Sequence, residues 1–248
     1  MAQFEEKALF GGAITGAAPQ GWIDGSTVRE IPDHQELFLS STTLSNLIFE
    51  VNEYVTKQQA LSTLSAVASP DLAPRTGGIH ADADAEGIAA ATYHLRDLCD
   101  EEDAIDVINA PRRVQLKKLT SPAAKDNHHP SAFSGLVKFT TPRKQRRGSA
   151  QLQRQNVSFI SVDASGGSSS SISPSAATDS NNSTQSCHFL LVRLPEKETD
   201  LLVFVNVPHD EFDLQGDPRA LAKEEDLACG LIQKFVEVLD IKDWSLFG

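Results

Sequence analysis

Short apolar runs and alternating apolar and polar residues mark several stretches of the chain as β-strands. Two are the strongest, His188–Leu194 and Leu201–Val207, and their nearly continuous apolar character predicts central strands covered on both faces. The polar segment Pro195–Asp200 between them has a length that suits an antiparallel hairpin, and Pro208 ends the second run. Weaker patterns predict further strands at 10–18, 36–40, 92–98, 114–119, 133–139 and 156–162.

Apolar residues recur at helical spacing in other parts of the chain. One stripe predicts a helix over Leu44–Val55, and Lys57–Ala68 either extends it or forms a second short helix. Another stripe predicts a helix over Ala222–Leu239, whose first turns carry acids that suit the positive end of the helix dipole. The acidic run Asp100–Asp103 predicts a turn, or the start of another helix.

A central sheet of about six of these strands, mostly antiparallel by the length of their connections, together with helices at both ends of the chain, predicts a layered α/β sandwich. Two segments fall outside this pattern: 69–91 predicts a weakly ordered insertion, and the Ser-rich 165–186 a disordered loop inserted into a hairpin. The remaining ~200 residues fit one domain spanning 1–248. Trp244 and Phe247 predict that the C-terminal tail docks on that domain.

The charge of the chain argues against some functions. A net charge of −12 and a pI near 5.0 disfavour a nucleic-acid binder, which needs cations to neutralise phosphates. Residues 112–154 carry +10, which leaves −22 for the rest of a chain whose total is −12. Such an acidic majority favours a basic partner and speeds association with it, unless it only keeps the protein soluble.

Cysteine usage and the N-terminal sequence predict the compartment. The three cysteines are far apart and show no CxxC spacing, which is typical of free thiols in a reducing compartment. The N-terminus carries acids in place of the apolar core of a secretory signal, and no run approaches the ~18 apolar residues of a membrane-spanning helix. We therefore expect a protein of the nucleus and cytoplasm that does not insert into membranes. The basic cluster Arg143–Arg147 is either a nuclear-localisation patch or a solvated hairpin loop.

Sequence motifs for catalysis are absent. The chain has no nucleophile elbow, P-loop, HExxH, dinucleotide-binding fingerprint or cluster of cysteine ligands. Bulky residues inside Gly21–Gly25 stop backbone amides from converging on a phosphate. The run Asp100–Asp103 lacks the glycine and the spaced oxygens of a calcium loop. We therefore predict a protein that is not an enzyme and that needs no metal or cofactor.

The densest collection of turn residues and acids lies between Leu9 and Leu39. It resembles the opening signature of the Ran guanine-nucleotide release factors, and the resemblance extends to Val205–Pro208 and to Asp243–Phe247. The segment 70–186 resembles that family less well. The residues that carry the resemblance near the N-terminus are Leu9–Thr15, Pro19–Asp24 and Arg29–Phe38.

This resemblance implies a PsbP-like α/β/α sandwich that binds the small GTPase Ran, promotes release of its guanine nucleotide and supports nuclear protein import. It implies two contact carboxylates in a Pro-Asp-x-Gln-Glu segment, Asp33 and Glu36. Asp24 and Arg29 lie beside them in the matched stretch. Trp22 is either an apolar anchor at the rim of that surface or a core residue.

Two other functions stay open on the sequence alone. The same sandwich could serve as an adaptor for another partner, such as a membrane channel or a scaffold, without nucleotide-release activity. It could also be a small-molecule enzyme or a luminal photosystem-like protein. An enzyme requires a pocket that holds an acid and a base with shifted pKa values. A luminal protein requires a transit peptide. We expect a monomer in each case.

Overall fold

The computed structural model describes residues 3–66, 81–100, 102–119, 130–143 and 182–247 of the chain. A large antiparallel sheet has the strand order β3-β4-β5-β9-β8-β7-β6, and a small one has the order β1-β2-β10. The large sheet consists of β3 (Ile23–Asp24), β4 (Gln35–Leu39), β5 (Asn46–Glu53), β9 (Thr199–Pro208), β8 (Asn182–Leu194), β7 (Ser131–Pro142) and β6 (Ala104–Val114). The small sheet consists of β1 (Phe4–Leu9), β2 (Ile14–Pro19) and β10 (Asp240–Ile241).

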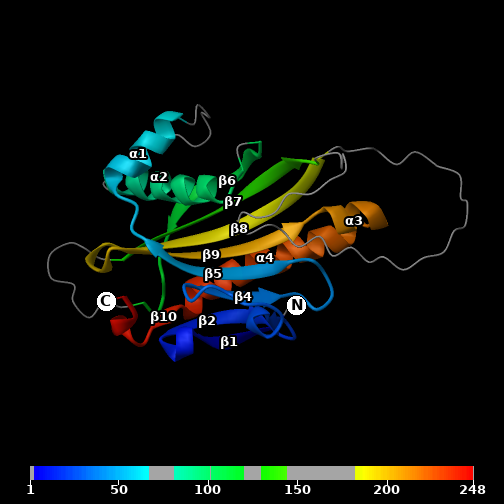
Figure 1. Ribbon diagram of the computed structural model, residues 1–248, viewed down its shortest axis with the longest axis horizontal. Coiled ribbons are helices and arrows are strands. Elements are labelled where there is room, and N and C mark those ends of the chain that lie inside the picture. Colours follow the sequence, from blue (N-terminus) through cyan, green and yellow to red (C-terminus); the bar gives the residue numbers. More distant parts are fainter. Residues whose placement is uncertain (1–2, 67–80, 101, 120–129, 144–181, 248) are drawn as a thin grey trace, which may run out of the picture.

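Helices cover both faces of the large sheet (Figure 1). Helices α1 and α2 lie over one face, and α4 lies with the small sheet over the other. This arrangement confirms the predicted layered sandwich around a mostly antiparallel sheet. The helices are α1 (Lys57–Ala66), α2 (Ala81–Asp97), α3 (Asp210–Gln215) and α4 (Pro218–Val238), and the 3-10 turns are η1 (Phe10–Gly12), η2 (Gly25–Thr27), η4 (Pro195–Lys197) and η5 (Trp244–Phe247).

The two strongest predicted strands are confirmed as β8 and β9, neighbours near the middle of the large sheet. Alternate side chains of each strand enter the two core layers, so both faces are buried. The predicted hairpin between them is also confirmed, and η4 closes it with Glu198 in the left-handed region at φ 46°. The predicted strands at 36–40 and 133–139 are found as β4 and β7.

The predicted helix over Leu44–Val55 is wrong, because this segment forms strand β5. Leu47 and Phe49 enter the core on the α4 side, whereas Ile48 enters the core on the α2 side. A strand buried on both faces has apolar residues at consecutive positions, and such a run also matches a helical stripe by coincidence. What decides in favour of a strand is the pairing of β5 with β4 and β9. The local sequence does not contain this information.

The predicted strand over Thr92–Leu98 is also wrong, because all but its last residue belong to α2. Residues 81–91 of the predicted insertion form the first part of the same helix, which agrees with their alanine content. Gly87 lets α2 approach the sheet, since a Cβ there would lie 2.0 Å from the ring of Phe133. In the acidic run, the described residues 100, 102 and 103 precede strand β6, and the backbone N–H of Asp103 donates to the carbonyl of Asp100 at 3.1 Å, so the predicted turn is found in place of a helix start.

Other expectations are met in part. The predicted strand at 10–18 begins only at Ile14, after the turn η1, and the one at 114–119 contributes Val114 alone, to β6. Residues 182–186 of the Ser-rich segment belong to β8, and strand β7 pairs with β8 from Pro142 opposite Asn182. Three predictions lie wholly or partly outside the described residues. They are the strand at 156–162, the part of the insertion before residue 81 and the part of the Ser-rich segment before residue 182.

A buried network of charges ties α2 to the centre of the large sheet. Asp200 Oδ2 lies 2.9 Å from His94 Nε2, and Asp200 Oδ1 accepts a hydrogen bond from Arg193 Nε at 3.2 Å. Arg193 also pairs with Glu86 at 3.1 Å, and its guanidinium lies 3.9 Å from the ring centre of Tyr54. Each buried charge in this network therefore has a partner.

Helix α4 confirms the predicted C-terminal helix and is fixed at its N-terminal end by polar contacts. Asp217 caps it by accepting hydrogen bonds from two backbone N–H groups, at 3.0 and 3.1 Å. Glu225 lies 2.6 Å from His188 Nε2 and 3.2 Å from His209 Nε2. Burial raises the pKa of Glu225, but hydrogen bonds from His188, His209 and Ser186 outweigh burial and lower that pKa to about 2.

We expect Asp200→Ala to lower the free energy of unfolding by about 3–5 kcal/mol, because buried Arg193 would lose the fully buried one of its two carboxylate partners and keep only the partly exposed Glu86. Urea denaturation followed by circular dichroism measures this change. Asp213→Ala, at an exposed position of α3, is the control and should change stability by less than about 0.5 kcal/mol. Equal losses in both variants would contradict the role of the network.

Glu225 should make stability depend on acid pH. Its pKa in the folded protein is about 2, below the ordinary value of 4.5, so its contribution is complete above pH 4.5 and is lost as the pH falls from 4.5 toward 2. We expect Glu225→Gln to remove this part of the acid-induced fall in Tm. Thermal unfolding at several pH values measures it, and Asp226→Asn, at an exposed neighbouring position, should keep the full fall.

Candidate protein-binding site

The stretch with the most distinctive sequence forms one edge of the large sheet. Residues 22–36, called here the acidic edge, contain strand β3 and the loop that leads into β4. Strand β3 pairs with β4, with Ile23 opposite Leu39 and Asp24 opposite Phe38, and it is the last strand of the described sheet on this side. The acidic edge carries four carboxylates and one cationic side chain.

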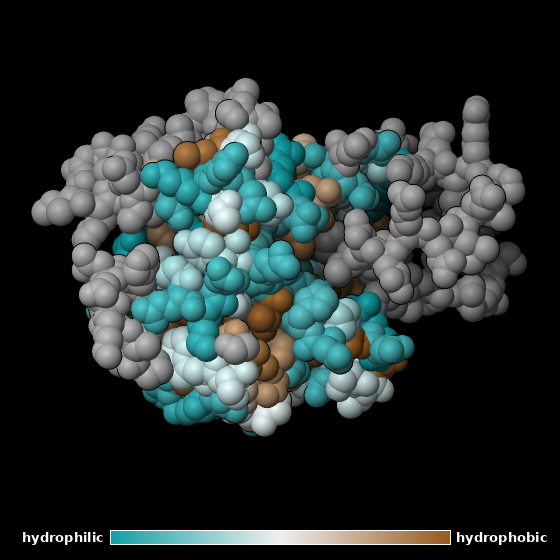
Figure 2. Space-filling model, turned by 60° about the vertical axis from the view of Figure 1, so that its left-hand side comes forward, coloured by the Kyte–Doolittle hydropathy of each residue, from teal (hydrophilic) through white to brown (hydrophobic). Residues whose placement is uncertain are grey.

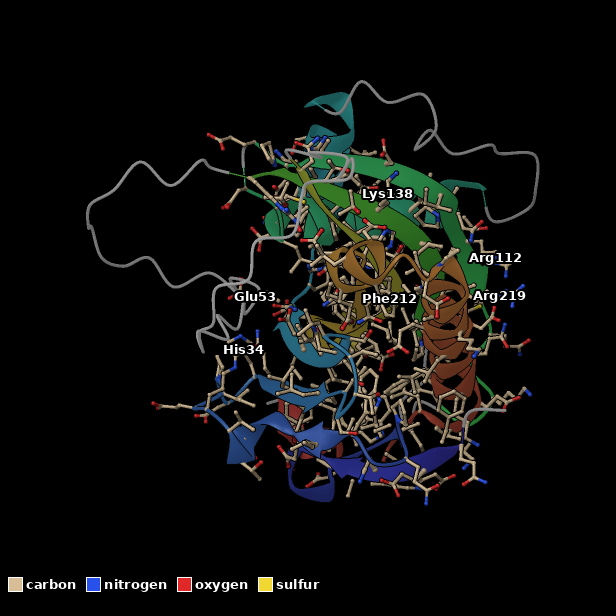
Figure 3. All side chains as sticks on the ribbon, turned by 90° about the vertical axis from the view of Figure 1, so that its right-hand side faces the viewer. His34, Glu53, Arg112, Lys138, Phe212 and Arg219 are labelled. Carbon is tan, nitrogen blue, oxygen red and sulfur yellow. The ribbon has the colours of Figure 1, made fainter. Side chains whose placement is uncertain are left out.

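Asp33 lies at the corner of a turn that leads into β4. Gln35 donates its backbone N–H to the carbonyl of Pro32 at 2.9 Å, and Val51 donates to the carbonyl of His34 at 2.9 Å. These bonds fix the backbone of the turn while the side chain of Asp33 stays exposed. Figure 3 shows the neighbouring His34 at the outer margin of the molecule, on the same side as Glu53. The backbone at Asp33 is therefore held in place, and its carboxylate is open to a partner.

Glu36 has a structural role that the sequence did not indicate. Its Oε1 accepts a hydrogen bond from the backbone N–H of Phe10 at 2.6 Å, and its side chain is half-buried. Phe10, Gly11 and Gly12 all have positive φ angles, of 50°, 65° and 95°. Such a conformation is unfavourable for a phenylalanine, and the hydrogen bond from Phe10 to Glu36 helps to hold the turn between β1 and β2.

Asp24 acts as the cap of η2. Its Oδ1 accepts hydrogen bonds from the backbone N–H of Ser26 at 2.8 Å and from Ser26 Oγ at 2.6 Å. The hydroxyl of Thr27 donates to the carbonyl of Asp24 at 2.6 Å. These contacts satisfy one carboxylate oxygen and leave the exposed side chain with a second.

The remaining two predicted site residues differ in their surroundings. Trp22 is half-buried and packs against the core cluster on the α4 side of the sheet, which agrees with the alternative that it is a core residue. Arg29 is exposed, and its side chain has no hydrogen-bond partner among the described residues. The five predicted residues therefore share one edge of the sheet, but each has a different local role.

Sequence reasoning missed two apolar side chains on the acidic edge. Ile23 is 45% exposed and Val28 is 63% exposed. Ile23 lies in the two-residue edge strand β3, and Val28 lies at the end of η2. An isolated apolar residue within a short polar segment is the signal that would have identified each of them.

The arrangement of the acidic edge suits binding. Fixed carboxylates beside exposed apolar side chains form a surface that complements a cationic protein patch. In the described part of the chain, His, Cys, Asp and Glu residues form no group of three that could hold a metal ion. No helix among the described residues is long and apolar enough to cross a membrane.

Comparison with known families gives this surface a context. A family model described as the Ran-interacting Mog1 protein matches residues 7–208, most of the chain. The chain belongs to the Mog1 family. The matched residues include the acidic edge and the turn at Phe10, and they end where β9 ends.

Individual relatives agree with this membership of the Mog1 family. The Ran guanine nucleotide release factor of Bos taurus is 24% identical over 244 residues, covering 98% of this chain and 96% of the relative. The nuclear import protein MOG1 of Saccharomyces cerevisiae is 54% identical over 37 residues, covering 15% of this chain and 17% of that protein.

A solved structure confirms the fold of this family member. The crystal structure of the Saccharomyces cerevisiae Ran-binding protein Mog1p matches with a TM-score of 0.51 and 18% sequence identity. The match covers 100% of both chains. At this identity the likeness establishes the arrangement of helices and strands alone.

We expect Glu36→Ala to lower the free energy of unfolding by about 1–3 kcal/mol, because the N–H of Phe10 would lose its acceptor in a partly buried place. Glu36→Gln should lose less, since its amide oxygen can still accept that bond. Guanidinium denaturation measures stability, and hydrogen exchange of the Phe10 amide reports the bond itself. If the two variants were equally stable, the anchoring role of Glu36 would be wrong.

Proposed function

We propose that this protein binds the small GTPase Ran and promotes release of its guanine nucleotide, in support of nuclear protein import. The observation that carries the proposal is the match of the Ran-interacting family model to residues 7–208, which contain the whole acidic edge. The names of the bovine and yeast relatives support the same activity. The protein would act as a monomer in the nucleus and cytoplasm.

The proposed activity needs no chemical step by the protein. A partner that binds the nucleotide-free form of a GTPase more tightly than the loaded form must, by thermodynamic linkage, weaken nucleotide binding by the same factor. Each tenfold weakening requires about 1.4 kcal/mol of differential binding. This protein would thus be a non-catalytic regulator, and a rigid surface of fixed carboxylates suits that task.

Asp33 is the residue that we propose as the main charged contact. GTPases hold phosphates with cationic groups, and an exposed carboxylate can pair with such groups once the nucleotide leaves. Glu36 would contribute its second oxygen, since Oε1 is bonded to Phe10. Asp24 and Arg29 would flank this pair, with Trp22 supporting the edge from within the core.

The apolar residues of the acidic edge would complete the contact. Ile23 and Val28 expose apolar surface next to the carboxylates. Interfaces commonly surround a few desolvated apolar contacts with polar groups, and charged groups set orientation and association rate. We therefore propose that Val28 is covered by Ran in the complex, with Asp33 setting the orientation.

We expect Asp33→Lys to weaken Ran binding, and the acceleration of nucleotide release, by at least about tenfold, because it places a cation opposite cationic groups. Release of a fluorescent GDP analogue from purified Ran measures the activity, and calorimetric titration of nucleotide-free Ran measures the affinity. Asp213→Lys reverses an exposed charge on α3 and is the matched control, so it should behave like the unmodified protein.

The same assays separate the competing functions. Ran binding without faster nucleotide release would favour an adaptor over a release factor. Failure of the unmodified protein to bind Ran at micromolar concentrations would overturn the proposal as a whole. If the Asp33→Lys variant bound Ran normally, the acidic edge would be wrong as the binding surface, even if the protein itself bound Ran.

A further inference from the structure

The C-terminal segment is bonded to the turn that Glu36 holds. The carbonyl of Ala13 accepts hydrogen bonds from the backbone N–H of Lys242 at 2.8 Å and from that of Asp243 at 3.1 Å. Just before this point, β10 pairs with β2, with Ile241 opposite Ile14. The last residues of the chain are thus fixed to the first strands by backbone bonds.

Hydrogen bonds and one turn of the backbone connect the acidic edge to the C-terminal segment. Glu36 bonds to Phe10, the turn from Phe10 to Ala13 follows, and Ala13 bonds to the start of the C-terminal segment. Phe10 also packs against Phe49, with ring centres 5.6 Å apart, which ties the turn to the core. Figure 1 shows the red C-terminal segment beside the end of the β1–β2 ribbon.

The turn η5 is packed on its inner side and open on its outer side. Trp244 and Phe247 meet edge to face with ring centres 6.1 Å apart, and both pack against the core cluster on the α4 side. Asp243 Oδ1 accepts hydrogen bonds from Ser245 N–H at 2.9 Å and from Ser245 Oγ at 2.7 Å. Leu246 remains 38% exposed.

An exposed leucine on a fixed backbone differs from one on a loose tail. A binding partner does not have to pay the entropy of ordering a leucine whose backbone is already fixed. More of the free energy of burying that leucine therefore appears as affinity. Figure 2 brings this end of the molecule forward and shows a narrow hydrophobic strip among hydrophilic residues in its lower half. An apolar anchor next to fixed carboxylates is the pattern of a protein-binding hot spot with a polar rim.

We propose that the Ran-binding surface extends from Asp33 and Glu36 across the turn at Phe10 onto η5, where Leu246 is an apolar anchor. This inference rests on the proposed function. Its occupant is Ran, because the surface continues the acidic edge through bonded residues. The part of Ran that fits this surface would carry a cationic group opposite Asp33 and Glu36. It would also carry an apolar patch opposite Leu246, on the other side of the turn from Phe10 to Ala13.

The extension assigns a second role to the bond between Glu36 and Phe10. That bond positions the turn, and the turn positions η5 through Ala13. Glu36 is therefore a positioning residue for Leu246 as well as a charged contact. A change of Glu36 that removes the bond should weaken Ran binding more than one that removes the charge alone, so Glu36→Ala should bind more weakly than Glu36→Gln.

The test compares two leucines of similar exposure. Leu246→Ser should raise the Kd for nucleotide-free Ran about five- to tenfold, because a partly exposed leucine that becomes covered contributes about that much. Leu61→Ser is the matched control, since Leu61 is 43% exposed on α1 at the other side of the sheet, and its Kd should not change. Circular dichroism and Tm verify that both variants fold.

A measurement on the unmodified protein keeps the test decisive if Leu246→Ser unfolds. Amide hydrogen exchange of residues 243–247 should slow at least severalfold when nucleotide-free Ran is added. Unchanged exchange under saturating Ran would overturn the extension. Slower exchange at high concentrations of this protein alone would also overturn it, because a second copy would then cover the surface.

The Asp33→Lys variant separates failure of this inference from failure of the proposed function. If Asp33→Lys weakens Ran binding while Leu246→Ser and the exchange of residues 243–247 show no effect, the extension is wrong and the proposed function stands. If the unmodified protein does not bind Ran, both are wrong. Loss of affinity in both variants, with Leu61→Ser unchanged, supports the extended surface.

Discussion

The burial of β8 and β9 on both faces is the constraint on which the rest of the structure depends. Two adjacent strands with apolar side chains on both sides require two covering layers. Helices α1 and α2 provide one layer, and α4 with the small sheet provides the other. The edge strands β3 and β6 can then be largely exposed, because the centre already holds most of the apolar area.

That division between centre and edge leaves the outer strands free for binding. Strand β3 has only two residues, and the acidic edge beyond it contributes little to the core apart from Trp22 and Ile31. Glu36 is the exception, since one of its oxygens supports the turn at Phe10. Substitution of Glu36 therefore changes charge and local structure together, whereas substitution of Asp33 changes charge alone. Binding data on Asp33 are consequently easier to interpret.

The sequence predicted those parts of the fold that have the longest and clearest apolar patterns. The hairpin of β8 and β9 and helix α4 have long, clear patterns, and both were found. The pattern of strand β5 predicts a helix because its apolar residues, buried on both faces, lack the alternation of a half-buried strand and also fit a helical spacing. Helix α2 was missed because its alanines give a weak apolar stripe, and because Tyr93 and Leu95 alternate with polar residues.

The candidate site was predictable in its location but not in its contacts. The acids of the segment Pro32–Glu36 stood out by composition and by resemblance to a family. The bond from Phe10 to Glu36 joins residues 26 positions apart, and no local pattern encodes such a contact. The exposure of Val28 depends in the same way on which loop residues find a core to enter.

The backbone bonds from Lys242 and Asp243 to Ala13 have a consequence for biosynthesis. A ribosome makes the acidic edge first, and the residues that brace the turn beside it follow only after β8, β9 and α4 have been made. The turn at Phe10 therefore gains this support only once residues 240–243 have left the exit tunnel. A chain terminated before these residues would carry the acids without that brace.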